Sequence, residues 1–293
     1  MMVLTMTSKI QSIRLEDTEA VEVLFNFYQA SHAKKILIYT PAMGVPAKFY
    51  HKLAEQFVSY GYHVAVLELR GHGRSNIRVG HLTDFGYDHI VQQDIHALVT
   101  DLSDQHPSLP IVLGGHSLGA QFSLLYASRH PELIDALLLM ACASPDSSNF
   151  RGRQKAQVFI APYLFSLVSK IIGHHPGKTF GFGATESKTL INDWSYLART
   201  GCFKKGNDDF DYEQALKTLK KQIFVYSFET DHFAPAEAVN AINAKCVASD
   251  LKHYVFKPDV LSFKANHLNW AKYGHEIAPT IHQDLEQSHA RNV

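Results

Sequence analysis

A serine between two glycines is the clearest chemical signal in the chain. The pentapeptide "GHSLG" at 115–119 follows a short apolar run and precedes an apolar stretch with helical character. A serine on such a turn, between a strand and a helix, is raised clear of the sheet, and the helix N-terminus stabilises negative charge beside it. We therefore interpret Ser117 as a nucleophile. The alternative is a serine that only caps the helix.

A serine hydroxyl becomes a good nucleophile only beside a base, usually a histidine, that a carboxylate orients. In proteins with this kind of turn the chain order is serine, then acid, then histidine. Asp231 follows the apolar run 222–228 and begins a turn that Pro235 ends. We interpret Asp231 as the acid. Glu229 is the fallback, and an aspartate that only caps the turn is the alternative.

The stretch "SFKANHLNWAKYGHEIAP" at 262–279 supplies the candidate bases. His267 lies in the predicted loop before the final helix, whereas His275 falls inside that helix or at its edge. His232 is adjacent to the proposed acid, and we interpret it as a neighbour rather than the base. The sequence therefore favours His267 as the general base.

An oxyanion hole needs two backbone N–H donors aimed at the developing charge. One is expected from Leu118, the residue after the nucleophile. The other is expected from the loop "PAMG" that follows the apolar run 34–40. Pro41 has no N–H to donate, so Met43 is the predicted donor and Ala42 is the alternative.

Short apolar runs alternate with helical patterns along most of the chain, which predicts a mostly parallel sheet with helices on both faces. The runs 9–17 and 20–30 are rich in β-forming residues and predict an opening hairpin. The runs interpreted as buried strands are 34–40, 62–69, 111–116, 133–143, 222–228 and 251–256.

The alternation stops near Ser144 and resumes near Gln222. The stretch 144–218 contains aromatic and helical pieces but no clear strand. We expect this stretch to be a cap inserted over the edge of the sheet, so that 1–143 and 219–293 form the core.

These motifs resemble those of the α/β-hydrolase superfamily across nearly the whole chain. The similarity is carried by "GGHSLG", by "LELRGHGRS" at 67–75, by the acid loop "ETDHFAP" and by the histidine loop "ANHLNW". A closer similarity is to a poorly characterised bacterial branch of predicted α/β-hydrolases. It rests on the acid loop, on "NDWSYLARTG" at 192–201 and on the His-x-x-Trp ending.

The resemblance implies an α/β-hydrolase fold with a helical cap insertion. Carried over residue by residue, it implies the triad Ser117, Asp231 and His267, the same set that the residues themselves favour. The chain departs from many members of the superfamily at one place, where Pro41-Ala42 stands for the His-Gly of the oxyanion loop.

Composition limits the partners that we expect. Lys plus Arg and Asp plus Glu both number 28, which gives no reason to expect nucleic acid. The three cysteines lie far apart, which predicts neither a disulfide framework nor a zinc site and favours a cytoplasmic location. His174-His175 has no acidic or cysteine partner at ligand spacing, so we expect no metal. The apolar stretch 158–173 is shorter than a membrane span, so we expect no integral membrane segment.

Together the residues predict a serine hydrolase that cleaves a carboxylic ester of a small or medium acyl substrate through an acyl-enzyme, without a cofactor. The same triad also serves thioester, C–C and peptide hydrolysis and acyl transfer, and the fold also serves in non-catalytic ligand binding. The oligomeric state is left open. Four apolar residues of the cap are expected mainly to pack it onto the sheet, the alternative being to line an acyl or aromatic pocket: Phe159, Tyr163, Phe165 and Leu167.

Overall fold

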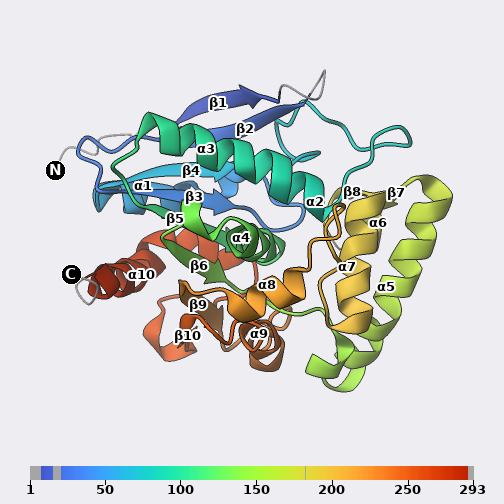
Figure 1. The fold of residues 1–293 in the computed structure, drawn as a ribbon. Helices are drawn as coiled ribbons and strands as arrows, with labels where there is room; N and C mark the ends of the chain where they lie inside the picture. Colours follow the sequence, from blue (N-terminus) through green and yellow to red (C-terminus); the bar gives the residue numbers. More distant parts are fainter. Residues whose placement is uncertain (1–7, 16–20, 182, 290–293) are drawn as a thin grey trace.

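An eight-stranded sheet forms the centre of the part of the chain that the computed structural model describes, residues 8–15, 21–181 and 183–289 (Figure 1). The strand order is β1-β2-β4-β3-β5-β6-β9-β10, and the strands from β4 to β10 run parallel. The predicted α/β fold with a mostly parallel sheet is therefore confirmed. The strands are β1 Lys9–Arg14, β2 Glu22–Tyr28, β3 Lys35–Thr40, β4 Tyr62–Leu67, β5 Ile111–His116, β6 Ala136–Met140, β9 Gln222–Phe228 and β10 Asp250–Phe256.

The central strands are buried at every position because helices cover both faces of the sheet. All residues of β3, β4, β5 and β6 are buried, which matches their continuous apolar sequences. The opening hairpin is also confirmed, since β1 and β2 pair in antiparallel fashion and β2 then pairs with β4.

Helices α1 and α10 pack on one face of the sheet, and α3 and α4 lie on the other (Figure 1). A π-helical segment, Ile90–Ile95, lies between α2 and α3. The core helices are α1 His51–Ser59, α2 Tyr87–His89, α3 His96–Gln105, α4 Leu118–Arg129, α9 Ala236–Asn243 and α10 Gly274–His289.

Residues between β6 and β9 form helices beside the carboxyl end of the sheet (Figure 1). The expectation that this stretch holds no strand is wrong, because two short strands pair in antiparallel fashion there. Helix α8 contacts α4, and so covers the core rather than the sheet edge. The elements are α5 Gly152–Ile172, β7 His174–Pro176, α6 Gly177–Phe180, β8 Thr185–Ser187, α7 Lys188–Thr200 and α8 Tyr212–Thr218. The division at 144 and 218 stays a prediction.

Helix α5 differs most from its prediction. It begins at Gly152, before the apolar stretch 158–173, and has 21 residues, so the apolar stretch understates the length of the helix. The expectation that the chain has no integral membrane segment stays a prediction. By length and composition, α5 is the one helix among the described residues that reaches the size of a membrane span. Of the four apolar residues expected to pack the cap onto the sheet, only Phe165 is buried; Phe159, Tyr163 and Leu167 are exposed.

Candidate active site

The order of the strands brings two loops together at the carboxyl edge of the sheet. The chain passes from β3 to β4 on one side and then returns to place β5 on the other side of β3. The loop after β3, which contains Met43, therefore lies next to the turn after β5, which contains Ser117. Such a change of direction is where parallel sheets place their ligands.

Ser117 lies on a strained turn between β5 and α4. Its backbone has φ 55° and ψ −116°, a conformation that non-glycine residues rarely adopt. Both flanking glycines are required by the close approach of neighbouring backbone. A Cβ on Gly119 would lie 2.2 Å from the Thr40 carbonyl oxygen, and one on Gly115 would lie 2.5 Å from the carbonyl carbon of Gly119. The G-x-S-x-G pattern is thus explained by sterics.

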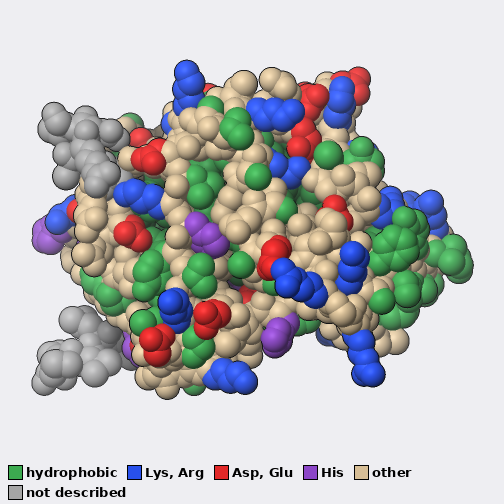
Figure 2. All heavy atoms as spheres, turned by 90° about the horizontal axis from the view of Figure 1, so that it is seen from below, with side chains coloured by type: hydrophobic (Ala, Val, Ile, Leu, Met, Phe, Trp, Pro, Cys, Tyr) green, Lys and Arg blue, Asp and Glu red, His purple; other side chains and the backbone are tan. Residues whose placement is uncertain are grey.

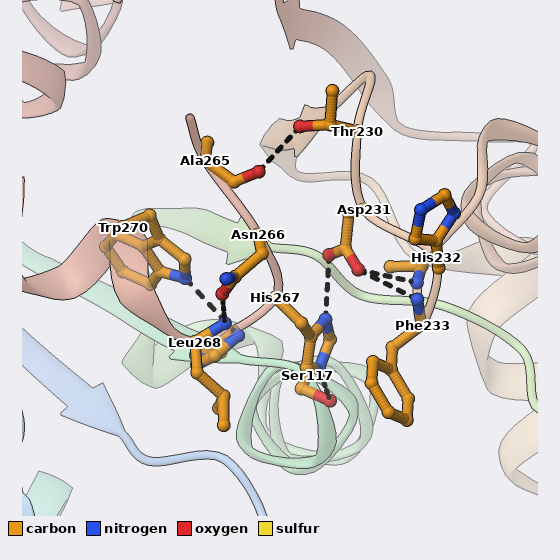
Figure 3. Close-up of polar contacts among 12 residues, drawn as sticks. Ser117, Thr230, Asp231, His232, Phe233, Ala265, Asn266, His267, Leu268 and Trp270 are labelled. Carbon is orange, nitrogen blue, oxygen red and sulfur yellow. Dashed lines mark hydrogen bonds and ion pairs between the residues drawn. The ribbon is translucent and has the colours of Figure 1, made fainter. Parts of the chain in front are cut away.

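A chain of hydrogen bonds connects the three side chains predicted as catalytic (Figure 3). His267 Nε2 lies 2.9 Å from Ser117 Oγ, and His267 Nδ1 lies 2.7 Å from Asp231 Oδ2. Figure 3 shows the imidazole ring between the serine and the carboxylate. The three residues come from turns after β5 and β9 and from the loop before α10, and their spatial arrangement is that of a nucleophile, a base and an orienting acid.

Asp231 makes the contacts that both interpretations of this residue expect. Its Oδ1 accepts hydrogen bonds from the N–H groups of Phe233 and Ala234, at 2.9 and 3.2 Å, and so caps the turn. Its Oδ2 accepts the bond from His267. The carboxylate is buried, with 2% of the residue exposed. The turn therefore fixes the carboxylate in the orientation that the histidine needs.

The other candidates lie away from the hydrogen-bonded chain. Glu229 is exposed, and His275 lies at the start of α10 with most of its side chain exposed. His232 borders the cavity above Ser117, and its carbonyl accepts a hydrogen bond from Gln154 of α5. None of these three residues contacts Ser117 in the described part of the chain.

The loop after β3 leaves Met43 as the available donor. The N–H of Ala42 donates to the Tyr50 hydroxyl at 3.0 Å, so the alternative donor is already engaged. Among the described residues, neither the Met43 N–H nor the Leu118 N–H has a hydrogen-bond partner. Both residues line the cavity together with Ser117.

Two buried aromatic residues stabilise the base of the site, and no motif in the sequence indicates their roles. The Tyr50 hydroxyl lies 2.9 Å from His116 Nδ1, and the Trp270 indole N–H donates to His116 Nε2 at 3.4 Å. Burial lowers the pKa of His116 well below its ordinary value, and the adjacent His267 lowers it further. His116 is therefore neutral at pH 7, so it adds no positive charge beside His267.

A cavity of about 660 Å³ opens above Ser117. Helix α5 forms one wall, and the other walls include the loops after β3, β5, β6 and β9, the loop before α10 and a residue of α7. Its lining is mainly apolar and includes Met43, Phe150, Val158, Ala161, Phe165, Trp194, Phe233 and Leu268. Within the described part of the chain, no group of three His, Cys, Asp or Glu side chains is placed to hold a metal ion.

Comparison with known proteins places this geometry in a family. The family model described as serine aminopeptidase, S33 (Hydrolase_4) matches residues 31–182, slightly more than half of the chain. A monoacylglycerol lipase of Mycolicibacterium smegmatis is 36% identical over 122 residues, which is 42% of this chain and 41% of that protein. Lysophospholipase L2 of Escherichia coli K12 is 27% identical over 126 residues, 41% of this chain and 36% of that protein. The chain thus spans about two fifths of these curated relatives.

Solved structures agree with the fold over almost the whole length. An esterase from Thermogutta terrifontis superposes with a TM-score of 0.62 at 15% identity, covering 95% of this chain and 98% of that one. At this identity the likeness shows the fold alone. Because the family model contains the Ser117 turn and matches more than half of the sequence, the chain belongs to the serine aminopeptidase S33 family of α/β-hydrolases.

Proposed function

We propose that the protein is a serine hydrolase that cleaves a carboxylic ester carrying a small or medium acyl chain. The observation that supports this most directly is the chain of hydrogen bonds from Ser117 through His267 to Asp231 at the floor of an apolar cavity. The relatives named as a monoacylglycerol lipase and a lysophospholipase favour an ester over a peptide or a C–C bond.

The proposed reaction has two halves, acylation of Ser117 and hydrolysis of the acyl-enzyme. His267 Nε2 removes the proton of Ser117 Oγ as the oxygen attacks the ester carbonyl, and the Met43 and Leu118 N–H groups donate to the oxyanion. The imidazolium is stabilised by Asp231 and then protonates the leaving alcohol. A water molecule, deprotonated by the same histidine, attacks the acyl-enzyme. The imidazolium then returns the proton to Ser117 Oγ as the bond to the acyl group breaks and the acid is released.

The lining of the cavity favours an acyl chain with a small polar alcohol. Aromatic and aliphatic side chains from α5 and α7 face those of the acid loop, so an alkyl chain entering the cavity loses contact with water. Polar side chains are fewer: Arg153, Gln154 and Gln157 line the same cavity and supply polar groups for a hydroxylated leaving group.

Covalent labelling tests the nucleophile directly. The purified protein is treated with a fluorophosphonate, and the intact mass is measured for wild type, Ser117→Ala and His267→Ala. We expect one adduct on wild type and none on either variant, because the probe reacts only with an activated serine. Ser148→Ala, a change at a short 3₁₀ turn outside the cavity lining, serves as a matched control that retains the adduct.

The ester assignment is then tested with a series of p-nitrophenyl esters and monoacylglycerols. We expect kcat/KM to rise with acyl length up to a medium chain and then to stop rising when the cavity is full. An absence of adduct on wild type contradicts the proposed chemistry and favours a non-catalytic binding protein. An adduct combined with faster cleavage of peptide or thioester substrates contradicts the ester assignment alone.

A further inference from the structure

Helix α5 presents a stripe of large apolar side chains to solvent. Their exposed fractions run from 40% at Leu164 to 74% at Ile171. The spacing of three, four and one residues puts these side chains on one side of the helix. Globular proteins rarely expose so many large apolar side chains side by side without a partner. The stripe consists of Phe159, Ile160, Tyr163, Leu164, Leu167 and Ile171.

The opposite side of α5 is already occupied within the protein. Pro162, Phe165, Ser166 and Ser169 are the buried residues of the helix, and α5 packs along α7. Val158 and Ala161 line the cavity above Ser117. The helix is therefore apolar on two sides, of which one faces the cavity and the other faces outward. This arrangement is typical of a helix that lies at an interface rather than one covered by its own chain.

The charges of α5 are of one sign. Arg153, Lys155 and Lys170 are exposed near its two ends, and Gly152–Ile172 contains no aspartate or glutamate. Figure 2 shows apolar side chains gathered at the end of the molecule that carries α5 in Figure 1, with Lys and Arg beside them. An apolar stripe bordered by cations complements an anionic lipid surface.

A second copy of the chain fits this surface less well. In an antiparallel pair of α5 helices, Arg153 and Lys155 of one copy approach Lys170 of the other, and in a parallel pair like ends meet. Cations face cations in both arrangements, and the helix has no acid to compensate them.

We propose that the exposed stripe of α5 docks the protein onto anionic lipid surfaces. Docking places the cavity wall formed by α5 directly above the lipid, about one helix diameter (~10 Å) from the headgroups. Binding by this surface is independent of the proposed hydrolysis, because no residue of the stripe contacts Ser117, Asp231 or His267.

Vesicle co-sedimentation tests the docking surface. Wild type is mixed with vesicles of phosphatidylcholine alone or of phosphatidylcholine with phosphatidylglycerol. The test variant carries Ile160→Glu, Leu167→Glu and Ile171→Glu. The control carries the same change at three exposed apolar residues outside the stretch 144–218, Ile10→Glu, Val247→Glu and Val260→Glu, whose exposed fractions are 47%, 73% and 56%. We expect wild type and control to sediment with the anionic vesicles, and the α5 variant to bind at least about tenfold more weakly.

Each other outcome overturns the inference. Docking by α5 is contradicted if wild type binds neither kind of vesicle. It is also contradicted if the α5 variant and the control lose binding equally. A wild-type dimer in solution that the α5 variant converts to a monomer, without vesicle binding by either, identifies a second copy as the occupant. Thermal unfolding and fluorophosphonate labelling of the variants show whether the fold and Ser117 are intact.

A second observation concerns the buried pair of His72 and Glu186, which connects the loop after β3 to β8. His72 Nε2 is 3.0 Å from Glu186 Oε1 and 3.2 Å from the N–H nitrogen of Gly44, the residue after Met43. His72 Nδ1 lies 3.0 Å from the Arg70 carbonyl, to which it donates. The ring thus links the predicted oxyanion loop to the small sheet of the cap.

One nitrogen cannot serve both partners in the same protonation state. When His72 is charged, its Nε2–H donates to Glu186; when the ring is neutral, Nε2 accepts from the Gly44 N–H. The surrounding groups favour the charged state: Glu186 and Glu68 raise the pKa of His72 above its ordinary value despite burial. His175 of β7, whose pKa burial lowers, is the other titratable group that faces Glu186.

The loop and the cap are also in steric contact. Gly44 has φ +75°, and a Cβ there would lie 2.7 Å from the Gly183 carbonyl carbon. A shift of β8 is therefore transmitted to the loop that carries Met43. We infer that His72 and Glu186 are positioning residues that set the separation between β8 and the oxyanion loop; this inference rests on the proposed function.

The rate of fluorophosphonate labelling as a function of pH tests the pair. In Glu186→Gln the carboxylate is lost, so His72 becomes neutral at lower pH than in wild type. We therefore expect the labelling rate at neutral pH to fall by about tenfold, and the decrease in labelling rate that wild type shows at alkaline pH to occur at lower pH. Glu229→Gln, an exposed acid beyond β9, is the control. A lower Tm with an unchanged pH profile shows a merely structural pair and overturns the inference. Wild type that is never labelled contradicts the proposed function instead.

Discussion

The turn around Ser117 and helix α5 border the same cavity, yet they are specified in different ways. At the turn, backbone atoms approach so closely that only glycine fits on either side of the serine. Along α5, four of 21 residues are buried, and the others are exposed or half-buried. Where close steric contacts demand particular residues, the sequence shows a recognisable motif. Where a segment needs only to be apolar, as in α5, the sequence shows an apolar stretch and no motif.

We expect the largest effect on activity from changing Asp231, on the loop after β9 that lies between the Ser117 turn and α5. In Asp231→Asn the amide oxygen still caps the turn at Phe233 and Ala234, but the residue no longer accepts from His267 as a carboxylate does. We expect kcat to fall by about ten-thousandfold with the fold intact.

Asp231→Ala separates the two roles of this residue. It removes the cap as well as the carboxylate, so stability falls by about 1 kcal/mol more than in the asparagine variant. Ester kinetics and urea unfolding measure both quantities. Equal stability of the two variants contradicts the capping role, and an active asparagine variant contradicts the catalytic role.

The second effect tests the steric rule at the turn. Gly119→Ala places a Cβ 2.2 Å from the Thr40 carbonyl oxygen, which α4 or β3 must move to relieve. We expect a loss of about 3 kcal/mol in the free energy of unfolding, together with loss of labelling at Ser117. Gly80→Ala is the control, because a Cβ at that position meets nothing within 4 Å. Equal stability of the two variants would sink the steric explanation.

The sequence was informative where sterics or hydrogen bonding demand particular residue types. Ser117, Asp231 and His267 stand on loops after recognisable strands, and the strand before Ser117 was predicted from a continuous apolar run. Pro41 narrowed the choice of oxyanion donor by its missing N–H. The Ala42 N–H is engaged by the hydroxyl of Tyr50, eight residues further on, because the 3₁₀ turn before α1 folds back onto the loop, and the residue types alone do not show this contact.

The cap is less predictable because its apolar residues fit both a buried packing face and an exposed face. A buried packing face and an exposed docking face have the same composition, and only the fold shows which side of α5 meets α7. The β7–β8 pairing was missed for a related reason. Strand β8 contains Glu186, a buried polar residue whose hydrogen bond with His72 connects segments more than 100 positions apart.

The buried pair predicts a pH dependence of stability. The pKa of His72 is raised above its ordinary 6.5 and that of Glu186 is lowered below its ordinary 4.5, each mainly by the other's charge working against burial. The histidine contribution is complete below 6.5 and is lost as pH rises through the raised pKa. The glutamate contribution is complete above 4.5 and is lost as pH falls through the lowered pKa.

The stabilisation by this pair is therefore greatest between pH 4.5 and 6.5. We expect wild type to lose more stability than Glu186→Gln when urea unfolding is compared between this window and alkaline pH. Glu132→Gln removes the acid of an exposed pair with His130 and serves as the control, with a profile close to wild type. Parallel profiles for wild type and Glu186→Gln would show that the pair is not ionised.

The smallest effect is expected on the outer face of α5, and it sharpens the contrast with the turn. Ile171 is 74% exposed, so Ile171→Glu removes little contact with the folded protein and we expect the free energy of unfolding to change by less than about 0.5 kcal/mol. Phe165, on the inner face of the same helix, is 7% exposed, and its ring centroid lies 4.4 Å from that of His175. Phe165→Ala is expected to cost about 3 kcal/mol because it leaves a cavity. Urea unfolding of both variants measures the difference. A large cost at Ile171 would mean that the outer face of α5 is covered in solution, because only an uncovered face accepts an apolar residue and a charged residue equally well.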